Sequence, residues 1–309
     1  FNRKEKELDE KSITIVALHL GTGGVEKYIS SLCGMLEDSY KINIISSYKV
    51  SEKPGFKFSD KINIKYLIND RPYKNEFIKA VRSLNIKDII KYGYKNIKIL
   101  ILKPIKEYKE ISKIDSKYVI TTLFHNRLVN DILDDNYIKI ATEHNYHNND
   151  KKYIKKLVDS VTNFDYFVIS TNELYDYYKN KVKPRCVLIS NPVIIENDSK
   201  SKLNNKNIIS VGRLSPEKGY MDLLKIYSVL ANKHPDWVLD IIGDGSEKER
   251  LEKFINNHNL NDKVTLHGFQ NKEYIDKIKD DIFIDCLNIS LDIKSGKELP
   301  IWEDDSEVK

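Results

Sequence analysis

The sequence predicts an α/β fold of two Rossmann-like, doubly wound domains, and three observations support this prediction. Short apolar segments alternate with longer amphipathic segments along most of the 309 residues. Such alternation is typical of parallel sheets whose strands are joined by helices, and this length suits about two domains. A polar stretch without periodicity, residues 193–207, interrupts the alternation. We therefore expect a first domain at residues 1–192, a linker at 193–207 and a second domain at 208–309.

Each expected strand of the first domain is an apolar run. The first of them, S-I-T-I-V-A-L-H-L, is apolar enough for burial inside a parallel sheet. The expected strands are Ser12–Leu20, Ile42–Ser46, Ile62–Leu67, Tyr118–Thr122, Tyr137–Glu143, Tyr166–Ser170 and Val187–Ser190. The expected helices, which have helical spacing of apolar residues, are Val25–Leu36, Asn75–Lys113, Lys151–Val161 and Asn172–Lys181.

The alternation resumes after the linker. The expected strands there are Ile208–Val211, Trp237–Ile242, Val264–Leu266 and Ile282–Cys286. The expected helices are Glu217–Lys233, Ser246–Asn257 and Lys272–Lys279. Because ligands of doubly wound sheets bind at the carboxyl ends of the strands, we expect the binding site in a cleft that the two domains face.

The composition is that of an ordinary globular protein, with 40% hydrophobic and 31% charged residues. No apolar run approaches the ~18–20 residues that a membrane span needs, and no secretory signal is visible. Phe1 is not an initiator Met, which indicates that the sequence starts within a longer product. Cys33, Cys186 and Cys286 lie far apart without a C-x-x-C pair. They favour a reducing, cytoplasmic compartment and neither a disulfide framework nor a zinc site.

The net charge of +5 is unevenly distributed. Residues 1–200 hold 35 Lys and Arg against 26 Asp and Glu, whereas residues 201–309 hold 16 against 20. The stretch Asn75–Lys113 interleaves Lys and Arg with Ile, Leu and Tyr, a pattern that can lie on an anionic membrane. One interpretation is an anionic partner such as a lipid surface or nucleic acid. The other is a Lys-rich composition, in which Asn75–Lys113 is a pair of domain helices with solvated Lys faces.

The segment Ile208–Gly219, I-I-S-V-G-R-L-S-P-E-K-G, predicts a strand, a tight loop and the start of a helix. Pro216 and Glu217 suit a first helical turn. Arg213 and Lys218 would then lie beside free helix N–H groups, a site for a phosphate or diphosphate. The alternative is an ordinary loop with two solvated charges.

A second glycine loop, Gly21-Thr22-Gly23-Gly24, follows the first strand. It would let the backbone approach an anion or a sugar closely. Its spacing is not G-x-G-x-x-G, so it does not predict a dinucleotide site. His144 and His147 follow another strand, but no third ligand is evident and we expect no metal. Taken alone, His144 is better explained as a hydrogen-bonded strand-end histidine.

Six motifs in this order resemble a GT-B glycosyltransferase of the large retaining family 4, formerly called group 1. They are G-G-V-E-K-Y from Gly23, T-E-H-N from Thr142, S-N-P from Ser190, V-G-R-L-S-P-E-K-G from Val211, I-G-D-G from Ile242 and L-H-G-F from Leu266. The resemblance covers roughly residues 12–286 and is strongest to members that build bacterial surface polysaccharides.

The resemblance implies a nucleotide-sugar donor held mainly by the second domain and an acceptor held mainly by the first. It implies that Arg213 and Lys218 grip the donor diphosphate, so that no metal is required. The donor-binding residues that it implies are Gly212, Arg213, Lys218, Gly243, Gly245, Phe269 and Gln270. It further implies that Gly23 and Gly24 approach the donor phosphate and the acceptor. His144 would contact the transferred sugar in the transition state without acting as a general base.

The sequence departs from the family after the last expected strand. The family has two glutamates separated by seven residues there, which contact the donor sugar and ribose. Here Glu298 and Glu303 have four residues between them and Glu298 and Glu307 have eight, so neither pair fits. The second domain, residues 201–309, is also short for this fold, and we interpret it as truncated.

We therefore expect a retaining glycosyltransferase that moves a hexose or related sugar from a nucleotide diphosphate onto a glycan or lipid-linked acceptor in surface-polysaccharide synthesis. We expect it in the cytoplasm, peripheral to the inner face of the plasma membrane, with no nucleic acid partner. The second hypothesis is a truncated, inactive relative that acts as a binding or partner protein. The third is a dinucleotide-dependent α/β enzyme, which the absent G-x-G-x-x-G loop disfavours.

Overall fold

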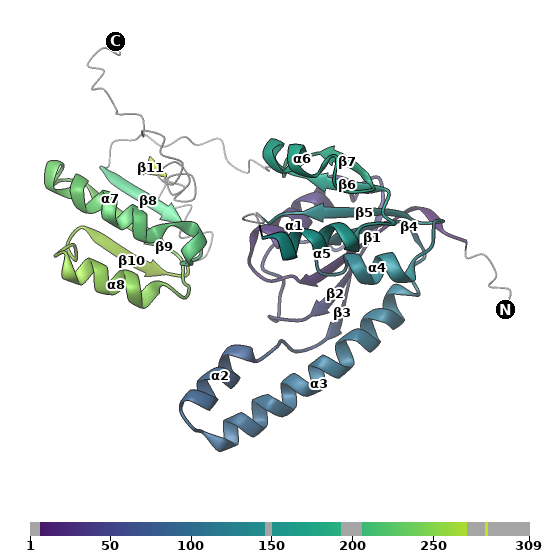
Figure 1. Ribbon diagram of the computed structural model, residues 1–309, viewed down its shortest axis with the longest axis horizontal. Helices are drawn as coiled ribbons and strands as arrows, with labels where there is room; N and C mark the ends of the chain where they lie inside the picture. Colours follow the sequence, from purple (N-terminus) through teal and green to yellow (C-terminus); the bar gives the residue numbers. More distant parts are fainter. Residues whose placement is uncertain (1–6, 146–149, 193–205, 271–281, 284–309) are drawn as a thin grey trace, which may run out of the picture. The chain divides into compact units, whose positions relative to one another are not determined.

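The computed structural model describes residues 7–145, 150–192, 206–270 and 282–283 (Figure 1). The chain separates into two compact units, Phe1–Ile194 and Ile195–Lys309. Every strand pairing within the described residues is parallel in both units.

Unit 1 contains a seven-stranded sheet with the order β3-β2-β1-β4-β5-β6-β7. The strands are β1 (Asp9–His19), β2 (Lys41–Tyr48), β3 (Asn63–Ile68), β4 (Ser116–Thr122), β5 (Ile138–Glu143), β6 (Tyr166–Ile169) and β7 (Arg185–Leu188). The order reverses between β1 and β4, the point at which doubly wound sheets bind ligands. Buried hydroxyls link these two strands, with Ser116 Oγ 2.8 Å from Ser12 Oγ and 2.7 Å from Thr14 Oγ1.

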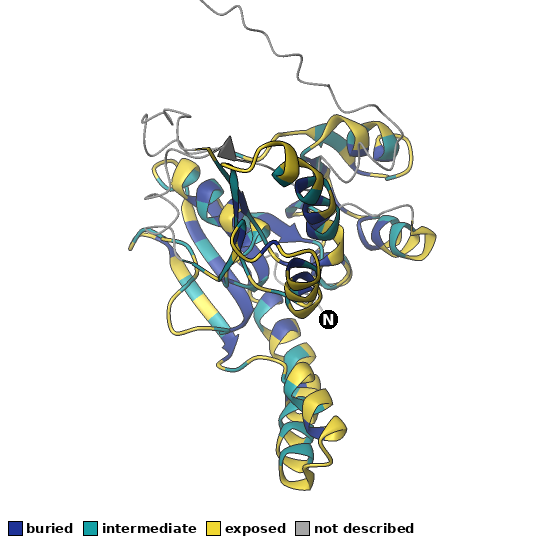
Figure 2. Ribbon diagram, turned by 90° about the vertical axis from the view of Figure 1, so that its left-hand side faces the viewer, coloured by how far each residue is buried: buried dark blue, intermediate teal, exposed yellow. Residues whose placement is uncertain are grey.

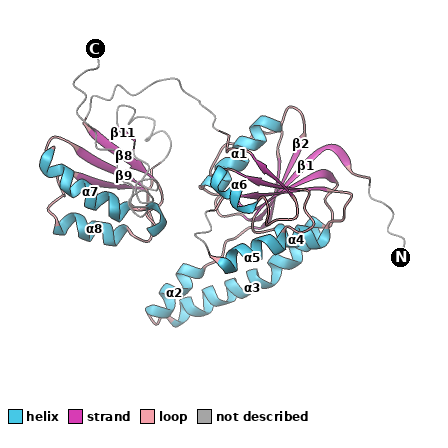
Figure 3. Cartoon of the chain, turned by 45° about the horizontal axis from the view of Figure 1, so that its top comes forward, coloured by secondary structure: helices cyan, strands magenta, loops and turns pink. Residues whose placement is uncertain are grey.

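Helices cover both faces of this sheet (Figure 3). They are α1 (Gly24–Leu36), α2 (Lys74–Arg82), α3 (Ile86–Ile111), α4 (Asn126–Ile132), α5 (Lys151–Ser160) and α6 (Asn172–Tyr178). Along β1, Ile13 and Ile15 pack in one core cluster with Ile29 of α1. Val16 points to the other face and packs in a cluster with Val129 of α4. This alternation follows from the two-residue period of a strand and confirms the predicted doubly wound sheet.

The expected helical stretch Asn75–Lys113 is two helices, α2 and α3, which lie side by side as a hairpin (Figures 1 and 3). The chain breaks at Leu84, whose φ is +53°. Asn85 then caps α3 by accepting a hydrogen bond from the backbone N–H of Asp88, at 3.2 Å. Asn is a preferred N-cap residue because its side-chain oxygen pairs with an N–H that has no partner within the helix. Helix α4 was not expected, because its seven residues show too little periodicity.

A buried cluster anchors the carboxyl-terminal part of α3 to the sheet. The carboxylate of Glu107 accepts hydrogen bonds from Ser47 of β2 and from Nε2 of His125, the latter at 3.0 Å. Lys103 Nζ lies 3.0 Å from the same carboxylate. Burial alone would raise the pKa of Glu107, but the hydrogen bonds from His125 and Ser47 and the neighbouring charges lower it to about 2. Glu107 is therefore ionised at neutral pH.

Unit 2 contains a four-stranded sheet with the order β10-β9-β8-β11. Its strands are β8 (Asn207–Val211), β9 (Val238–Ile242), β10 (Val264–Gly268) and β11 (Ile282–Phe283). Its helices are a 3-10 turn, η1 (Pro216–Lys218), α7 (Tyr220–Lys233) and α8 (Lys248–Asn257). Buried side chains of α7, α8 and β9 form one core cluster. The expected helix Lys272–Lys279 and the glutamates Glu298, Glu303 and Glu307 lie outside the described residues.

Candidate functional site

A small cavity of about 50 Å³ lies at the carboxyl ends of β1, β4 and β5, next to the switch point of the unit 1 sheet. Its polar lining includes His19 from the end of β1, Glu26 from the first turn of α1, and His144 directly after β5. Phe124, which is 63% exposed, forms part of its wall. The sequence therefore brings two imidazoles and one carboxylate together at the edge where ligands are expected.

His144 is a mostly buried, neutral imidazole. Its Nε2 lies 3.0 Å from Thr142 Oγ1, and its ring centroid lies 4.3 Å from that of Tyr28. Burial lowers the pKa of His144 to about 4, because the charged form loses hydration that no carboxylate replaces. At neutral pH the ring can hydrogen-bond a hydroxyl but adds no positive charge to the site.

The burial of His144 predicts a loss of stability in mild acid. Its pKa is 6.5 unfolded and about 4 folded, so the unfolded chain binds the proton first as the pH falls. The free energy of unfolding should therefore drop between pH 6.5 and 4, by at most about 3 kcal/mol from this group. We expect the free energy of unfolding of His144→Gln, measured in urea, to change less with pH in this window than that of wild type. The same substitution at His258, which is exposed at the carboxyl-terminal cap of α8, serves as the control. Equal slopes in wild type and His144→Gln would contradict the prediction.

Glu143 holds the loop that carries His144. Its carboxylate accepts hydrogen bonds from the backbone N–H of Asn145 at 2.6 Å and from the hydroxyl of Tyr153 at 2.9 Å. Burial raises the pKa of Glu143, and these hydrogen bonds partly offset that effect. His147 lies outside the described residues. Among the residues that are described, no three His, Cys, Asp or Glu side chains group as metal ligands.

The glycine loop after β1 is shaped by a pair that the sequence analysis missed. His19 Nδ1 lies 2.9 Å from Glu26 Oε1, at the amino end of α1. A Cβ on Gly23 would overlap the carboxylate of Glu26, whereas a Cβ on Gly24 would meet no described atom within 4 Å. Gly24 thus leaves open space at the start of α1. The sequence signal that could have predicted this pair is a His at the end of a strand followed by an acidic residue in the first turn of the next helix.

In unit 2, the loops after the three strands β8, β9 and β10 join at one edge through backbone hydrogen bonds. Gly212 donates to Ile242, Leu214 donates to Asp244, and Gly243 donates to Gly268, at 2.9, 3.0 and 2.8 Å. The loop after β8 is therefore held by the loop after β9. Most of the donor-site residues expected in this unit come together at this edge.

Arg213 and Lys218 lie on the loop and the 3-10 turn that follow β8. The Arg213 side chain is 74% exposed, and its guanidinium lies 3.5 Å from the Glu217 carboxylate. The hydroxyl of Ser215 and the charges of Arg213 and Lys218 lower the pKa of Glu217. Lys218 is half-buried, and the chain then turns through Gly219 at a φ of +72° to enter α7. This local pair leaves most of the guanidinium exposed to solvent.

The glycines of this edge have a packing role inside the protein. Gly243 has a φ of +150°, and a Cβ there would overlap the carbonyl oxygen of Gly212. A Cβ on Gly245 would lie 2.7 Å from the carbonyl carbon of Leu214. These contacts are with backbone, which cannot rotate away. The glycines are therefore required for close approach of two protein loops, in addition to any approach of a ligand.

Phe269 and Gln270 follow β10 at the same edge. Phe269 is 67% exposed, and Gln270 Nε2 donates to the carbonyl oxygen of His267 at 2.9 Å. His267 is held in turn by Asp240, with Nε2 2.6 Å from the carboxylate. A phenyl ring exposed beside an ordered amide can stack on a planar group and offer it hydrogen bonds.

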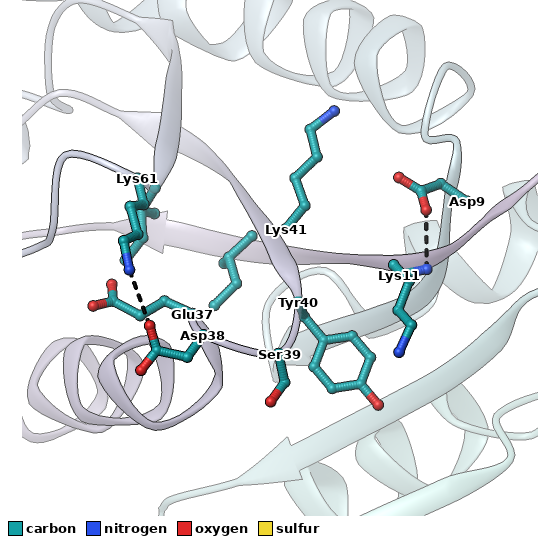
Figure 4. Close-up of a pocket in the computed structure, with 10 residues that line it drawn as sticks. Asp9, Lys11, Glu37, Asp38, Ser39, Tyr40, Lys41 and Lys61 are labelled. Carbon is teal, nitrogen blue, oxygen red and sulfur yellow. Dashed lines mark hydrogen bonds and ion pairs between the residues drawn. The ribbon is translucent and has the colours of Figure 1, made fainter.

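A larger hollow of about 380 Å³ lies at the opposite, amino-terminal edge of the unit 1 sheet (Figure 4). Lys61 pairs there with Asp38 at 2.9 Å, and Lys11 and Lys41 stand near Asp9. Cations and carboxylates are mixed and solvated, and no expected site residue lies among them. We assign the hollow no part in ligand binding.

Comparison with known proteins agrees with this geometry. The sequence pattern of the family described as "Glycosyl transferases group 1" matches residues 194–288, which contain the β8, β9 and β10 loops. The chain is a glycosyltransferase. This finding disfavours the dinucleotide-dependent enzyme considered from the sequence.

Two relatives of this glycosyltransferase align with most of its length. It is 28% identical to an uncharacterized glycosyltransferase of Haemophilus influenzae over 83% of this chain and 68% of the relative. It is 24% identical to an N-acetylgalactosaminyltransferase of Campylobacter jejuni over 85% of this chain and 71% of the relative. The name of that enzyme specifies a diphospho-undecaprenol-linked acceptor.

The fold is GT-B, as the sequence predicted. The structure of a variant of TarM from S. aureus, solved with UDP, superposes with a TM-score of 0.64. The alignment covers 87% of this chain and 80% of TarM at 12% identity.

Proposed function

We propose that this glycosyltransferase transfers a hexose or related sugar from a nucleoside diphosphate sugar to a glycan or lipid-linked acceptor, with retention of anomeric configuration. The observation that carries the donor assignment is the exposed Arg213 together with the half-buried Lys218, both of which follow the carboxyl end of β8. Cations fixed beside helix N–H groups suit a diphosphate. A lipid-linked acceptor is supported by the name of the Campylobacter relative. A role in surface-polysaccharide synthesis is supported by a relative of Streptomyces coelicolor, 24% identical, that is named an exopolysaccharide phosphotransferase.

In the proposed reaction, the bond between the anomeric carbon and the diphosphate oxygen breaks, and the acceptor hydroxyl oxygen bonds to that carbon. The hydroxyl proton leaves, and the nucleoside diphosphate departs with one additional negative charge. Arg213 and Lys218 would stabilise this charge without a metal. The neutral imidazole of His144 would hydrogen-bond a hydroxyl of the sugar, and the open space at Gly24 would admit a phosphate or the acceptor. Phe269 and Gln270 would contact the nucleobase.

The proposed acceptor places the protein at a membrane. Lipid-linked acceptors stay at the bilayer surface, so the enzyme must reach that surface. Residues 51–100 carry 12 basic against 5 acidic residues, which favours association with anionic lipid. We propose peripheral binding to the inner face of the plasma membrane. No helix within the described residues is long and apolar enough to cross a membrane.

A thermal-shift screen with UDP, GDP, UDP-glucose, UDP-N-acetylglucosamine and GDP-mannose tests the donor site. A ligand that binds only the folded state raises the melting temperature, and we expect a shift with the nucleotides of one base. Arg213→Ala and Lys218→Ala should each weaken that nucleotide about 10- to 100-fold, because each removes a charge-assisted contact. The control is Lys225→Ala, which removes an exposed lysine of α7 and should leave nucleotide affinity unchanged.

Unchanged nucleotide affinity in both donor-site variants would overturn the donor assignment. Nucleotide binding without sugar transfer to any acceptor would favour the second hypothesis, an inactive relative that binds. That hypothesis is motivated by the spacing of Glu298, Glu303 and Glu307, which does not match the family pattern.

A further inference from the structure

Helix α3 exposes a continuous apolar stripe. Seven Ile and Tyr side chains, each 57–71% exposed, recur every three or four residues along it. We call them the outer stripe: Ile86, Ile90, Tyr94, Ile97, Ile101, Ile105 and Tyr108. At roughly 100° per residue, they fall within about 100° of one another around the helix axis. An exposed apolar surface of this length is unusual for a soluble protein and marks an interaction site.

The hairpin partner α2 contacts a different side of α3. The segment before α2 joins α3 through Tyr73, whose ring stacks on Tyr92 at 5.4 Å and whose N–H donates to Asn96 at 2.8 Å. The buried residues Ile99 and Glu107 also lie on this inner side. The outer stripe thus points away from α2 and from the sheet, and Figure 2 shows this part of the chain largely exposed.

Positive charge borders the outer stripe. Lys87, Lys91, Lys98 and Lys109 are exposed and follow one edge of it. The three carboxylates of α3, which is described throughout, are engaged elsewhere. Asp88 hydrogen-bonds Asn85, Glu107 is buried against His125, and Glu110 pairs with Lys65 at 2.6 Å. The face of α3 that carries the outer stripe therefore combines apolar side chains with positive charges and no free carboxylate. These properties match an anionic lipid surface.

The outer stripe also extends past the ligand-binding edge of unit 1. Lys106 Nζ donates to the carbonyl oxygen of Leu67 at 2.7 Å, so this turn of α3 is level with the carboxyl end of β3. A helix that joins parallel strands runs back against them. Residues 86–98 of α3 include no buried side chain and lie before this turn. At 1.5 Å per residue, these residues make about 20 Å of helix that lies beyond the turn at the carboxyl end of β3. Figure 1 shows this part of α3 projecting from the sheet together with α2.

We propose that the outer stripe of α3 enters the headgroup region of an anionic bilayer and holds the carboxyl edge of unit 1 next to the membrane surface. The inference deepens the proposed function and rests on it for the lipid-linked acceptor. Ile side chains enter the upper acyl region, the two Tyr rings lie at the interface, and the lysines contact anionic headgroups. A second copy of this chain fits less well, because it would bring two rows of lysines together.

Vesicle binding by the full chain tests the proposal. Unilamellar vesicles of phosphatidylglycerol and phosphatidylcholine in equal parts are compared with pure phosphatidylcholine in a flotation assay. The triple variant Ile90→Ser, Ile97→Ser, Ile101→Ser should lose affinity for the anionic vesicles about tenfold. Its control removes three apolar side chains of similar exposure elsewhere, as Met35→Ser, Ile189→Ser and Val229→Ser. Circular dichroism verifies that every variant is folded.

Two further sets of variants separate apolar insertion from charge. Lys87→Gln, Lys91→Gln and Lys98→Gln should each lower affinity about fivefold and abolish the preference for phosphatidylglycerol when combined. Ile97→Trp should show a blue-shifted emission with anionic vesicles only. Gln or Ser substitutions on α3 should leave nucleotide binding unchanged, whereas Arg213→Ala should bind vesicles as wild type does. Failure of the donor site and failure of the docking surface are therefore distinguishable.

Three results would overturn the proposal. The first is no binding of wild type to anionic vesicles. The second is equal vesicle binding by wild type and the triple Ile→Ser variant. The third is a wild-type dimer that the triple variant converts to a monomer without change in vesicle binding, which would assign the outer stripe to a second copy.

Discussion

Gly243→Ala is expected to unfold unit 2 or to destabilise it by about 3–5 kcal/mol. The new Cβ would overlap the carbonyl oxygen of Gly212 and lie 2.9 Å from its carbonyl carbon. It would also sit at a φ of +150°, which side chains other than glycine's hydrogen rarely adopt. Backbone must then move, and the hydrogen bonds that join the loops after β8, β9 and β10 would be lost. Trp237 directly precedes β9 of unit 2, so its fluorescence in urea follows the unfolding of this unit.

Two matched glycines separate the causes of this effect. Gly268 has a φ of +68°, but a Cβ there would meet no described atom within 4 Å. Gly268→Ala should therefore cost only about 1 kcal/mol of backbone strain. Gly34 lies at an exposed position in the last turn of α1 with equally open surroundings, and Gly34→Ala should stabilise by up to about 1 kcal/mol. A stability loss at Gly243 no larger than that at Gly268 would disprove the packing role.

Glu107→Ala is expected to destabilise unit 1 by about 3–5 kcal/mol. The buried carboxylate contacts Ser47, His125 and Lys103, and water does not reach this position to replace it. His125 is 1% exposed, and among the described residues its Nδ1 has no hydrogen-bond partner. Removing Glu107 would leave the other ring nitrogen, Nε2, with Ser47 Oγ at 2.8 Å and without its carboxylate partner. Urea unfolding followed by circular dichroism at neutral pH measures the loss.

Two controls test the reason for this loss. Glu110→Ala, one turn closer to the helix end, removes a pair with the half-exposed Lys65 and should cost less than about 1 kcal/mol. The pKa of Glu107 is about 2 when folded and 4.5 when unfolded. Its contribution is complete above pH 4.5 and should disappear as the pH falls toward 2. The contribution of residue 107 to the free energy of unfolding should not change with pH in that window in Glu107→Gln. If the stability of this variant fell with pH as steeply as that of wild type, the ionised carboxylate would not be the anchor.

The fold was largely predictable because its strands are locally encoded. Apolar runs such as Ile208–Val211 are strands in the structure, with ends shifted by one or a few residues. A pair of helices over residues 75–113 was one of the two interpretations, but the position of the break at Leu84 was not predicted. Helical spacing continues across it, and only the local capping by Asn85 starts the second helix. Helix α4 was missed because seven residues hold too few apolar positions.

The candidate site was predictable only where a residue follows a strand in sequence. His144, Arg213 and Gly243 could be placed at strand ends, because parallel strands end at one edge. The ion pair of His19 with Glu26, and the cluster around Glu107, depend on contacts between segments that no local pattern relates. The roles of the site residues in binding and transfer stay predictions for the experiments above.

The central position of β1 has a consequence for how the chain acquires its structure. Its neighbour β2 follows shortly afterwards, whereas Ser12 and Ser116, which join β1 to β4, are 104 residues apart. The whole α2–α3 hairpin must be synthesised before β4 appears. A nascent chain therefore presents the open side of β1 to solvent and to other chains for many seconds at ribosomal speed. We expect this unpaired strand, rather than any helix, to be the point at which folding is slow and at which aggregation begins.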